Sequence, residues 1–358
     1  MQAPAGGLDP TPSPVEAPLG TSKILKILIK RALFDLGVLG AIHALRNRKT
    51  LTVTMFHRVI AETDERFPGA HPEYTLTPEE FEFCLTFFEL HYNVVSLDDV
   101  FDALNSGKPL GRALLITFDD GWRDNRDYAL PLLARAGLPA TLFVATEFVG
   151  SRRAFWQEEL YAAVVTGALT PSAIRSAAPS YALPEDLTGA NLAQHVIAHA
   201  ESLSGEERDR LIGELAARFP PTTRQMADAS DLAELQDAGV CLGGHGHSHA
   251  PLTDLAAPSD ELAQSVTVLK SLARGGSPHA MSLPHGKYDD RVIAAAHAAG
   301  FSLVFSSDRR LTPLSRLQSA DPLGRIDISR RILRDSNGRL SPANLATWLF
   351  FQPHAHAN

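Results

Sequence analysis

The sequence has few cysteines, no long uncharged apolar run and a deficit of positive charge. Its two cysteines, Cys84 and Cys241, lie far apart, which excludes a Cys-x-x-Cys zinc signature and argues against a disulfide framework. No stretch reaches the roughly 18 uncharged apolar residues of a membrane-spanning helix. The net charge of -8 argues against a nucleic-acid partner, because phosphate backbones are bound by clustered Lys and Arg.

The N-terminal residues differ in composition from the rest of the chain. Residues 1–22 contain five prolines and no hydrophobic periodicity, which predicts a disordered leader. No signal peptide is evident, so the predicted location is cytoplasmic or peripheral at the inner membrane face. Residues 23–49 are apolar with interspersed basic residues and predict an N-terminal helix. This helix either packs on the rest of the protein or contacts a membrane surface as a peripheral element.

Residues 50–358 alternate short β-rich runs with helical patterns, which predicts an α/β catalytic domain with a parallel sheet. The expected strands are Leu51–Phe56, Tyr92–Leu97, Ala113–Phe118, Ala140–Ala145, Val240–Gly243, Ala280–Leu283 and Phe301–Phe305. The pattern is compatible with an irregular barrel or an open doubly wound sheet. An Ala-rich helical span at about 151–226 interrupts the alternation and predicts an insertion over one rim.

Two adjacent carboxylates follow one of these strands. Asp119, Asp120 and Gly121 come directly after the apolar run that ends at Phe118. Active sites of parallel α/β folds form at the carboxyl ends of strands, and adjacent carboxylates coexist most readily beside a cation or a shared proton. The alternative is an Asp-Gly turn in which one carboxylate caps the next helix.

Three histidines follow a glycine turn. His245 and His249 are four residues apart, which places them on one face of a helical turn, whereas an extended chain would align His247 with them. The glycines argue against a long strand, so we predict that His245 and His249 bind a metal while His247 points away. Two imidazoles and one carboxylate leave coordination positions open, as catalytic metal sites do.

The motifs together resemble those of the polysaccharide deacetylases, the NodB homology and chitin deacetylase-like group known as carbohydrate esterase family 4. Residues 117–121, 245–249 and 284–289 occur in the order and spacing of that family, and residues 55–59 resemble the Tyr-His-Arg-Val opening of one bacterial branch. The resemblance covers about residues 51–333. It implies a distorted (β/α)7-type barrel, here with a helical insertion and an N-terminal helical extension.

The resemblance also implies roles for individual residues. Asp120, His245 and His249 correspond to the metal ligands, and Asp119 to the general base. The implied metal is Zn²⁺, with Co²⁺ or Ni²⁺ as alternatives, and no other cofactor is implied. His285 stands in place of the aromatic residue whose main-chain N–H stabilises the oxyanion.

Three positions depart from the family pattern. Ser282 replaces the arginine that pairs with the catalytic aspartate, and Arg123 or Arg331 could substitute for it. The histidine general acid has no clear counterpart near the C-terminus, so His57, at the end of the first strand, is the candidate imidazole. Gly246 replaces a Ser or Thr and predicts weaker positioning of the ligands.

The predicted function is metal-dependent hydrolysis of N-acetyl groups on a polysaccharide or lipid-linked glycan. Such an enzyme acts in carbohydrate metabolism and cleaves carbon–nitrogen bonds other than peptide bonds. The aromatic residues Trp122, Phe155 and Trp156 are candidates for stacking against sugar rings. The alternatives are a carbohydrate-binding relative with lost or weak catalysis and a metal amidase on a small non-sugar substrate.

Overall fold

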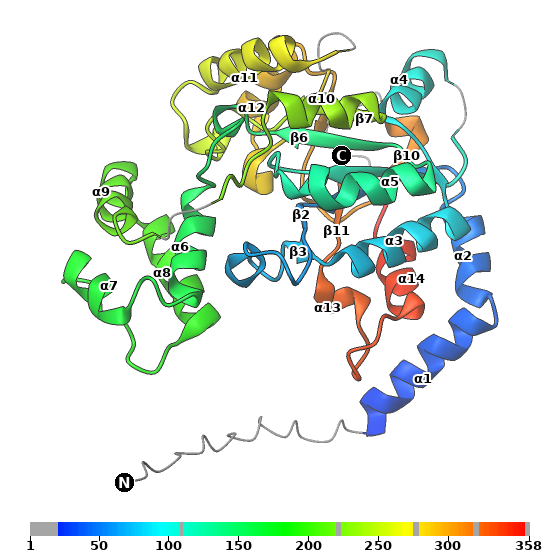
Figure 1. The fold of residues 1–358 in the computed structure, drawn as a ribbon. Helices are drawn as coiled ribbons and strands as arrows, with labels where there is room; N and C mark the ends of the chain where they lie inside the picture. Colours follow the sequence, from blue (N-terminus) through cyan, green and yellow to red (C-terminus); the bar gives the residue numbers. More distant parts are fainter. Residues whose placement is uncertain (1–20, 108–109, 220–222, 275–278, 318–321, 355–358) are drawn as a thin grey trace.

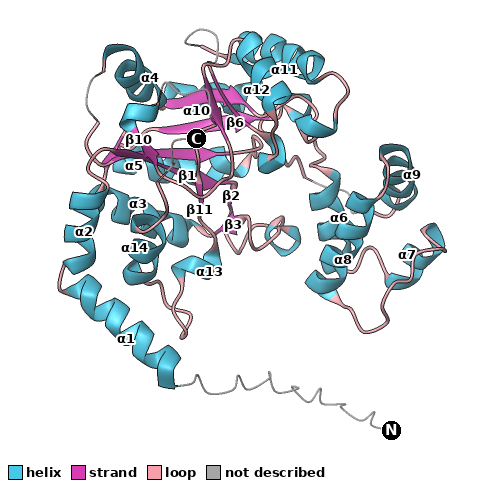
Figure 2. Cartoon of the chain, turned by 180° about the vertical axis from the view of Figure 1, so that it is seen from behind, coloured by secondary structure: helices cyan, strands magenta, loops and turns pink. Residues whose placement is uncertain are grey.

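The computed structural model describes residues 21–107, 110–219, 223–274, 279–317 and 322–354, and the predicted leader lies outside this range except for its last two residues. The fold is α/β, with helices packed around a central, largely parallel sheet (Figures 1 and 2).

The main sheet runs in the order β10-β1-β5-β6-β7-β8-β9, with β4 beside β5 and β11 beside β1. Its longer strands are β1 (Thr50–Phe56), β5 (Ala113–Phe118), β6 (Ala140–Val144), β7 (Val240–Gly244), β8 (Ala280–Ser282) and β9 (Leu303–Phe305). The shorter ones are β4 (Asn93–Val94), β10 (Thr312–Pro313) and β11 (Ile326–Asp327), and β2 (Arg58–Val59) pairs separately with β3 (Thr75–Leu76). Among the described pairs of the main sheet, only β1–β10 is antiparallel.

One segment connects strands at the two ends of the main sheet. Leu323 bridges Phe305 of β9, and Ile326 of β11 pairs with Thr54 of β1. Residues 323–327 therefore link β9 to β1, and the sheet curls into a distorted, incompletely closed barrel. This confirms the predicted barrel in place of the open doubly wound sheet.

Side chains alternate between the inside of the barrel and its helical coat. Leu115 of β5 shares an inner cluster with Phe143 and Phe305, whereas Phe118 packs 5.5 Å from the ring of Phe81 on α3 (Pro78–His91). A Cβ on Gly243 would lie 2.5 Å from the Phe143 ring, so this position needs glycine. The alternation directs Thr117 and Asp119 inward, towards the mouth of the barrel.

The remaining helices of the coat are α4 (Leu97–Ser106), α5 (Leu130–Ala136), α10 (Ala229–Asp237), α11 (Pro258–Leu272), α12 (Asp290–Ala298), α13 (Arg330–Leu333) and α14 (Pro342–Phe350). Helix α4 was not predicted, and it shortens the expected strand Tyr92–Leu97 to β4. Ser96 caps α4 by accepting from the Asp99 N–H, and the Asp99 carboxylate accepts from the Ser96 N–H. Such a reciprocal cap favours helix over strand at this point.

Residues 156–216, between β6 and β7, form a helical lobe beside the barrel (Figure 1). Its helices are α6 (Trp156–Val165), α7 (Pro171–Ala177), α8 (Gly189–Ser202) and α9 (Gly205–Ala216). They enclose an apolar cluster of their own that includes Leu160, Val196 and Leu215.

Two helices precede the barrel where one was expected. α1 (Thr21–Asp35) and α2 (Val38–Arg46) are separated at Gly37, whose φ of 73° breaks the helical path. α1 packs against α14, where Lys30 Nζ donates to Asn344 Oδ1 at 2.9 Å. Within the described residues, no helix combines the length and apolar character needed to cross a bilayer.

Candidate active site

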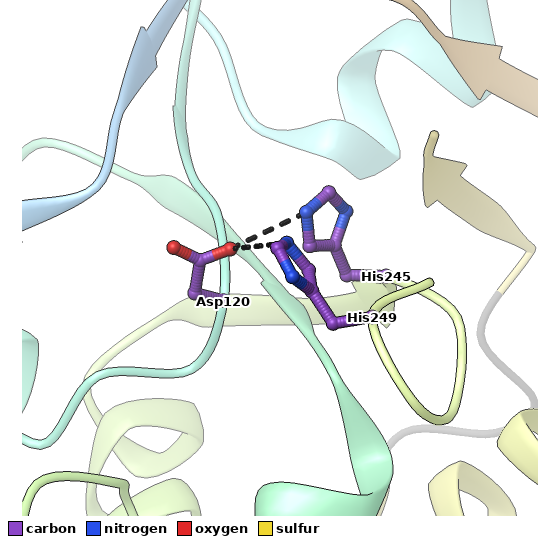
Figure 3. A group of neighbouring side chains, drawn as sticks. All are labelled: Asp120, His245 and His249. Carbon is purple, nitrogen blue, oxygen red and sulfur yellow. Dashed lines mark ion pairs between the residues drawn. The ribbon is translucent and has the colours of Figure 1, made fainter. Parts of the chain in front are cut away.

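The predicted metal ligands come together at the carboxyl ends of the strands. Asp120 follows β5, whereas His245 and His249 follow β7, and the three side chains converge (Figure 3). Asp120 Oδ1 lies 3.4 Å from His245 Nε2 and 3.3 Å from His249 Nε2. One ligand atom from each of the three residues lies within 4.8 Å of the others.

Backbone conformation delivers the second carboxylate to the same place as the first. Strand alternation alone would point Asp120 away from Asp119, but Asp120 has a φ of 80° and Gly121 a φ of 88°. This turn directs Asp120 towards His245 and His249. A left-handed conformation costs free energy for an aspartate, and such strain is concentrated at functional sites.

Neighbouring groups fix the orientation of the candidate ligand atoms. His245 Nδ1 lies 2.9 Å from Ser282 O, a contact that requires the proton on Nδ1 and leaves the Nε2 lone pair facing Asp120. Trp122 Nε1 donates to the other carboxylate oxygen, Asp120 Oδ2, at 2.8 Å. The ring of Phe155 stacks on His249 at 3.9 Å. Two imidazoles and a carboxylate, each oriented by a second contact, suit a divalent transition-metal ion.

The electrostatics of this cluster favour a positive charge at its centre. Burial opposes ionisation of Asp120, but hydrogen bonding and charge interactions with His245 and His249 hold its pKa well below the ordinary value. Burial also opposes protonation of His245, yet the carboxylates of Asp119 and Asp120 raise its pKa. A proton or a metal ion would satisfy the same negative potential.

Asp119 has a buried cationic partner that the sequence did not reveal. Arg325, in the segment before β11, donates from Nη1 to Asp119 Oδ1 and from Nη2 to Asp119 Oδ2, both at 2.7 Å. Burial opposes ionisation of Asp119, but the charges of Arg325 and His245 and the hydrogen bonds from Arg325 together lower its pKa. Arg325 Nη2 also donates to Ser282 Oγ at 2.7 Å.

The two substitutes proposed from the sequence for the missing arginine were wrong. Arg123 pairs with Asp127, and Arg331 is exposed on α13. No spacing rule connects Arg325 to the motif, since it lies 206 residues after Asp119. The only sequence signal for Arg325 was indirect: a carboxylate that is expected to be buried needs a cationic partner.

The other predicted residues border the same region. His285, after β8, has a φ of 56°, and its ring centroid lies 4.8 Å from that of His249. His57 follows β1, and its ring lies 5.0 Å from that of Tyr74. His247 contacts Thr146 Oγ1 through Nδ1 at 2.9 Å and is not part of the metal-ligand cluster.

The loop between the two candidate histidine ligands has an anchor of its own. Glu261 Oε1 on α11 accepts from the main-chain N–H groups of His247 and Ser248 at 2.8 and 2.6 Å. Gly246 has a φ of 71°, which suits glycine better than the Ser or Thr of the family pattern. Glu261 thus positions this loop from outside the motif.

A cavity of about 370 Å³ opens beside the cluster, between the barrel and the helical lobe. Its wall includes Asp119, Asp120, His57, His285 and Arg325, together with Glu158 and Glu201 from the lobe. The expected sugar-stacking role does not suit Trp122 and Phe155, which are only 1% and 4% exposed and contact Asp120 and His249 instead. Trp156 is partly buried and lines an adjoining cavity.

Comparison with known proteins identifies the family. The sequence pattern of the polysaccharide deacetylase family matches residues 106–304, which is more than half of the chain. A putative polysaccharide deacetylase of Bacillus subtilis (strain 168), YxkH, is 28% identical over 121 residues. That alignment spans 31% of this chain and 37% of the relative.

Solved structures share the fold. The deacetylase PplD of Streptococcus pyogenes, in complex with acetate, matches with a TM-score of 0.54 and 16% identity over 84% of this chain and 99% of its own. IcaB of Ammonifex degensii matches with a TM-score of 0.52 and 17% identity over 84% of this chain and 97% of its own. With the family pattern spanning β5 to β9, this chain belongs to the polysaccharide deacetylase family.

Proposed function

We propose that the protein hydrolyses the acetamido group of an N-acetylated glycan, releasing acetate and leaving a free amine on the sugar. The observation that carries this proposal is the juxtaposition of a cluster suited to a metal, Asp120, His245 and His249, with a separate carboxylate, Asp119, held by Arg325. Family membership supports the reaction class.

The residues have distinct roles in the proposed reaction. Asp120, His245 and His249 would hold a divalent cation, for which Zn²⁺ is our first candidate and Co²⁺ or Ni²⁺ are alternatives. When bound, the cation would polarise the acetyl carbonyl and increase the acidity of water. Asp119 would accept a proton from the attacking water, since Arg325 keeps its carboxylate ionised and oriented.

A main-chain donor would stabilise the oxyanion that forms on the acetyl carbonyl. His285 lines the cavity in a left-handed conformation, and we propose that its N–H donates to this oxygen. Because the donor belongs to the backbone, histidine can replace the aromatic residue of the family at this position.

The shape of the site supports a glycan over a small cyclic amide. A second cavity, of about 740 Å³, shares Phe155, Gln157, Glu201, His249 and His285 with the first. The two cavities therefore adjoin each other beside His249 of the candidate metal centre. The second cavity leaves room for sugar units beyond the one that reacts. A carbohydrate-binding relative without turnover is less favoured, because Arg325 supplies the partner of Asp119 that appeared to be missing.

Acetate release from N-acetylglucosamine oligomers tests the proposal. The protein would be stripped with a chelator and assayed after addition of Zn²⁺, Co²⁺ or Ni²⁺, with free amines measured in parallel. We expect equal amounts of acetate and amine, and only in the presence of metal. Metal binding without turnover on any acetylated glycan would favour the binding relative, and turnover on a cyclic ureide alone would favour the small-molecule amidase.

A further inference from the structure

The exposed apolar side chains of the protein are concentrated on the two N-terminal helices. Of the twelve large hydrophobic residues exposed in the described part of the chain, eight lie between residues 25 and 45. They are Leu25 (58% exposed), Leu28 (59%), Ile29 (50%), Leu33 (36%), Leu36 (77%), Val38 (37%), Ile42 (37%) and Leu45 (83%).

These side chains lie on the sides of α1 and α2 that do not pack on the barrel. The inner face is satisfied, since Phe34 stacks on Phe87 at 6.4 Å and His43 stacks on Phe350 at 4.0 Å. Outer positions recur every three or four residues in α1 and again in α2, which places them along one side of each helix. The helices are thus apolar on both sides, although only one side has a partner within the described residues.

The charge of this segment differs from that of the rest of the protein. Residues 21–49 contain seven Lys and Arg and a single acidic residue, Asp35, in a chain whose net charge is -8. Arg31, with a side chain 76% exposed, lies beside the apolar surface, and Arg48 and Lys49 are exposed after α2. Two copies of so basic a segment would repel each other, whereas an anionic surface would attract it.

We propose that α1 and α2 dock the protein on an anionic lipid bilayer. The exposed leucines and isoleucines would enter the boundary between headgroups and acyl chains, while the basic residues contact the headgroups. The acidic remainder of the protein would be repelled by the same surface, which would orient the bound molecule.

Vesicle flotation of the full chain tests this docking. We expect flotation with vesicles that contain phosphatidylglycerol, weaker flotation with phosphatidylcholine alone, and a decrease at high salt. Leu28→Asp combined with Leu36→Asp should lower the bound fraction about tenfold or more. Leu90→Asp, at a 73% exposed position on α3, is the matched control and should bind as the parent does.

Two results would overturn the proposal. One is equal flotation of the double variant and the parent, with both shown to be folded by circular dichroism. The other is absence of flotation together with a dimer in sedimentation analysis that the double variant abolishes, which would assign the surface to a second copy of the chain.

A separate observation concerns a carboxyl group in the candidate site. Glu158 lies one helical turn after Phe155 at the start of α6, so it shares a face with the ring that stacks on His249. Its Oε2 is buried and has no hydrogen-bond partner among the described residues, while the His71 main-chain N–H donates to the carboxylate. Glu158 and Asp119 line the same cavity.

We infer that Glu158 donates the proton that the leaving amine requires, an inference that rests on the proposed function. As the C–N bond breaks, its electron pair would pass to nitrogen and nitrogen would take the proton of Glu158. The oxygen from water would leave in acetate. Asp119 would hold one proton of that water and the other would pass to the amine product, after which solvent exchange would return Asp119 to its carboxylate and reprotonate Glu158.

The environment of Glu158 suits this role. Burial is the largest effect and, aided by the carboxylates of Asp120 and Asp124, raises the pKa of Glu158 to about 7, against the opposing charge of Arg58. The phenols of Tyr74 and Tyr161 also interact with Glu158. A carboxyl group with this pKa is largely protonated just below neutral pH and can still lose its proton during turnover.

Glu158→Gln tests the inference with two substrates. We expect about a 100-fold loss of kcat on an N-acetyl glycan and at most a few-fold loss on 4-nitrophenyl acetate, whose leaving group needs no proton. Glu214→Gln, at an exposed carboxyl of α9 outside both cavities, should leave both rates near the parent value. Equal losses on the two substrates would overturn the inference in favour of a structural role. A parent protein that hydrolyses the ester but no N-acetyl glycan would instead refute the proposed function.

Discussion

Arg325 forms a bidentate salt bridge with Asp119, in which both nitrogen–oxygen distances are 2.7 Å. The side chains of Arg325 and Asp119 are 1% and 3% exposed. The resemblance to the family pattern predicted an arginine at position 282, where this chain has a serine. Here the guanidinium comes from the segment that links β9 to β1, and Ser282 Oγ accepts one of its hydrogen bonds. The small Ser282 side chain leaves space for a cation that arrives from another part of the barrel.

Loss of this cation should impair both stability and activity. We expect Arg325→Met to lower the free energy of unfolding by about 3–5 kcal/mol, because a buried carboxylate is left without its partner. Glycan deacetylation should fall at least about 100-fold, because Asp119 is no longer held in position. Urea unfolding and acetate release measure the two effects, and a folded Arg325→Met protein with parental activity would contradict the assigned relationship.

An arginine restored at the family position provides a sharper test. The double variant Arg325→Ala with Ser282→Arg should be at least about tenfold more active than Arg325→Ala alone, since the new guanidinium can reach the same carboxylate. No recovery in a folded double variant would mean that Arg325 does more than hold Asp119.

The contrast between Asp119 and Arg325 shows what could be predicted from the sequence. Asp119 and Asp120 follow an apolar strand directly, and His245 and His249 follow another, so local pattern and parallel topology were sufficient to place them together. Arg325 lies in an irregular segment, and its position depends on how the barrel closes. Tertiary contacts of this kind leave no periodic signal in the sequence.

Local sequence signals also explain where the predicted fold was wrong. The β-rich run from Tyr92 concealed the cap at Ser96, where helix α4 begins. The break at Gly37 was missed because apolar periodicity continues on both sides of it. In each case a single residue determined the backbone path more strongly than the surrounding composition.

The two adjacent aspartates should separate metal binding from catalysis. We expect Asp120→Ala to lose most of its bound metal, because it removes the sole carboxylate of the described ligand cluster. Asp119→Asn should retain metal and lose activity, because it keeps its volume but cannot accept the proton. Metal content after dialysis and acetate release distinguish them, and equal metal retention in the two variants would show that the roles are misassigned.

The Trp122 indole should contribute to metal affinity without touching the ion. Trp122→Phe keeps a buried ring but removes the donor to Asp120 Oδ2. Loss of such a contact typically weakens metal binding by about 10- to 100-fold. Competition with a coloured chelator measures the change. Trp156→Phe, at a partly buried tryptophan of the lobe, is the control, and an unchanged affinity in Trp122→Phe would rule out the role of the indole.

The contribution of the His285 turn to activity should depend on its backbone conformation more than on the imidazole. His285→Asn is expected to keep activity within a few-fold, because asparagine tolerates the observed φ of 56° and retains the main-chain N–H. Gly286→Ala should lose activity strongly, since a Cβ there would collide with Ser307 Oγ and the residue has a φ of 67°. If His285→Asn were as inactive as Gly286→Ala, the imidazole itself would be required.

His43 should make stability depend on pH. Its ring is 1% exposed, and burial, together with the charges of Arg112, His91 and Arg46, lowers its pKa to about 4 from an ordinary value of 6.5. Below pH 6.5 the unfolded chain takes up a proton that the folded protein does not, so this contribution to stability is lost as the pH falls towards 4.

The expected loss is up to about 3 kcal/mol over that interval. Urea unfolding between neutral pH and pH 5 should therefore show a smaller decrease in His43→Leu than in the parent. His195→Leu, at an exposed histidine of α8, should retain the parental decrease. A His43→Leu protein that loses stability as steeply as the parent would mean that other buried groups, such as the carboxylates of the candidate site, dominate acid unfolding.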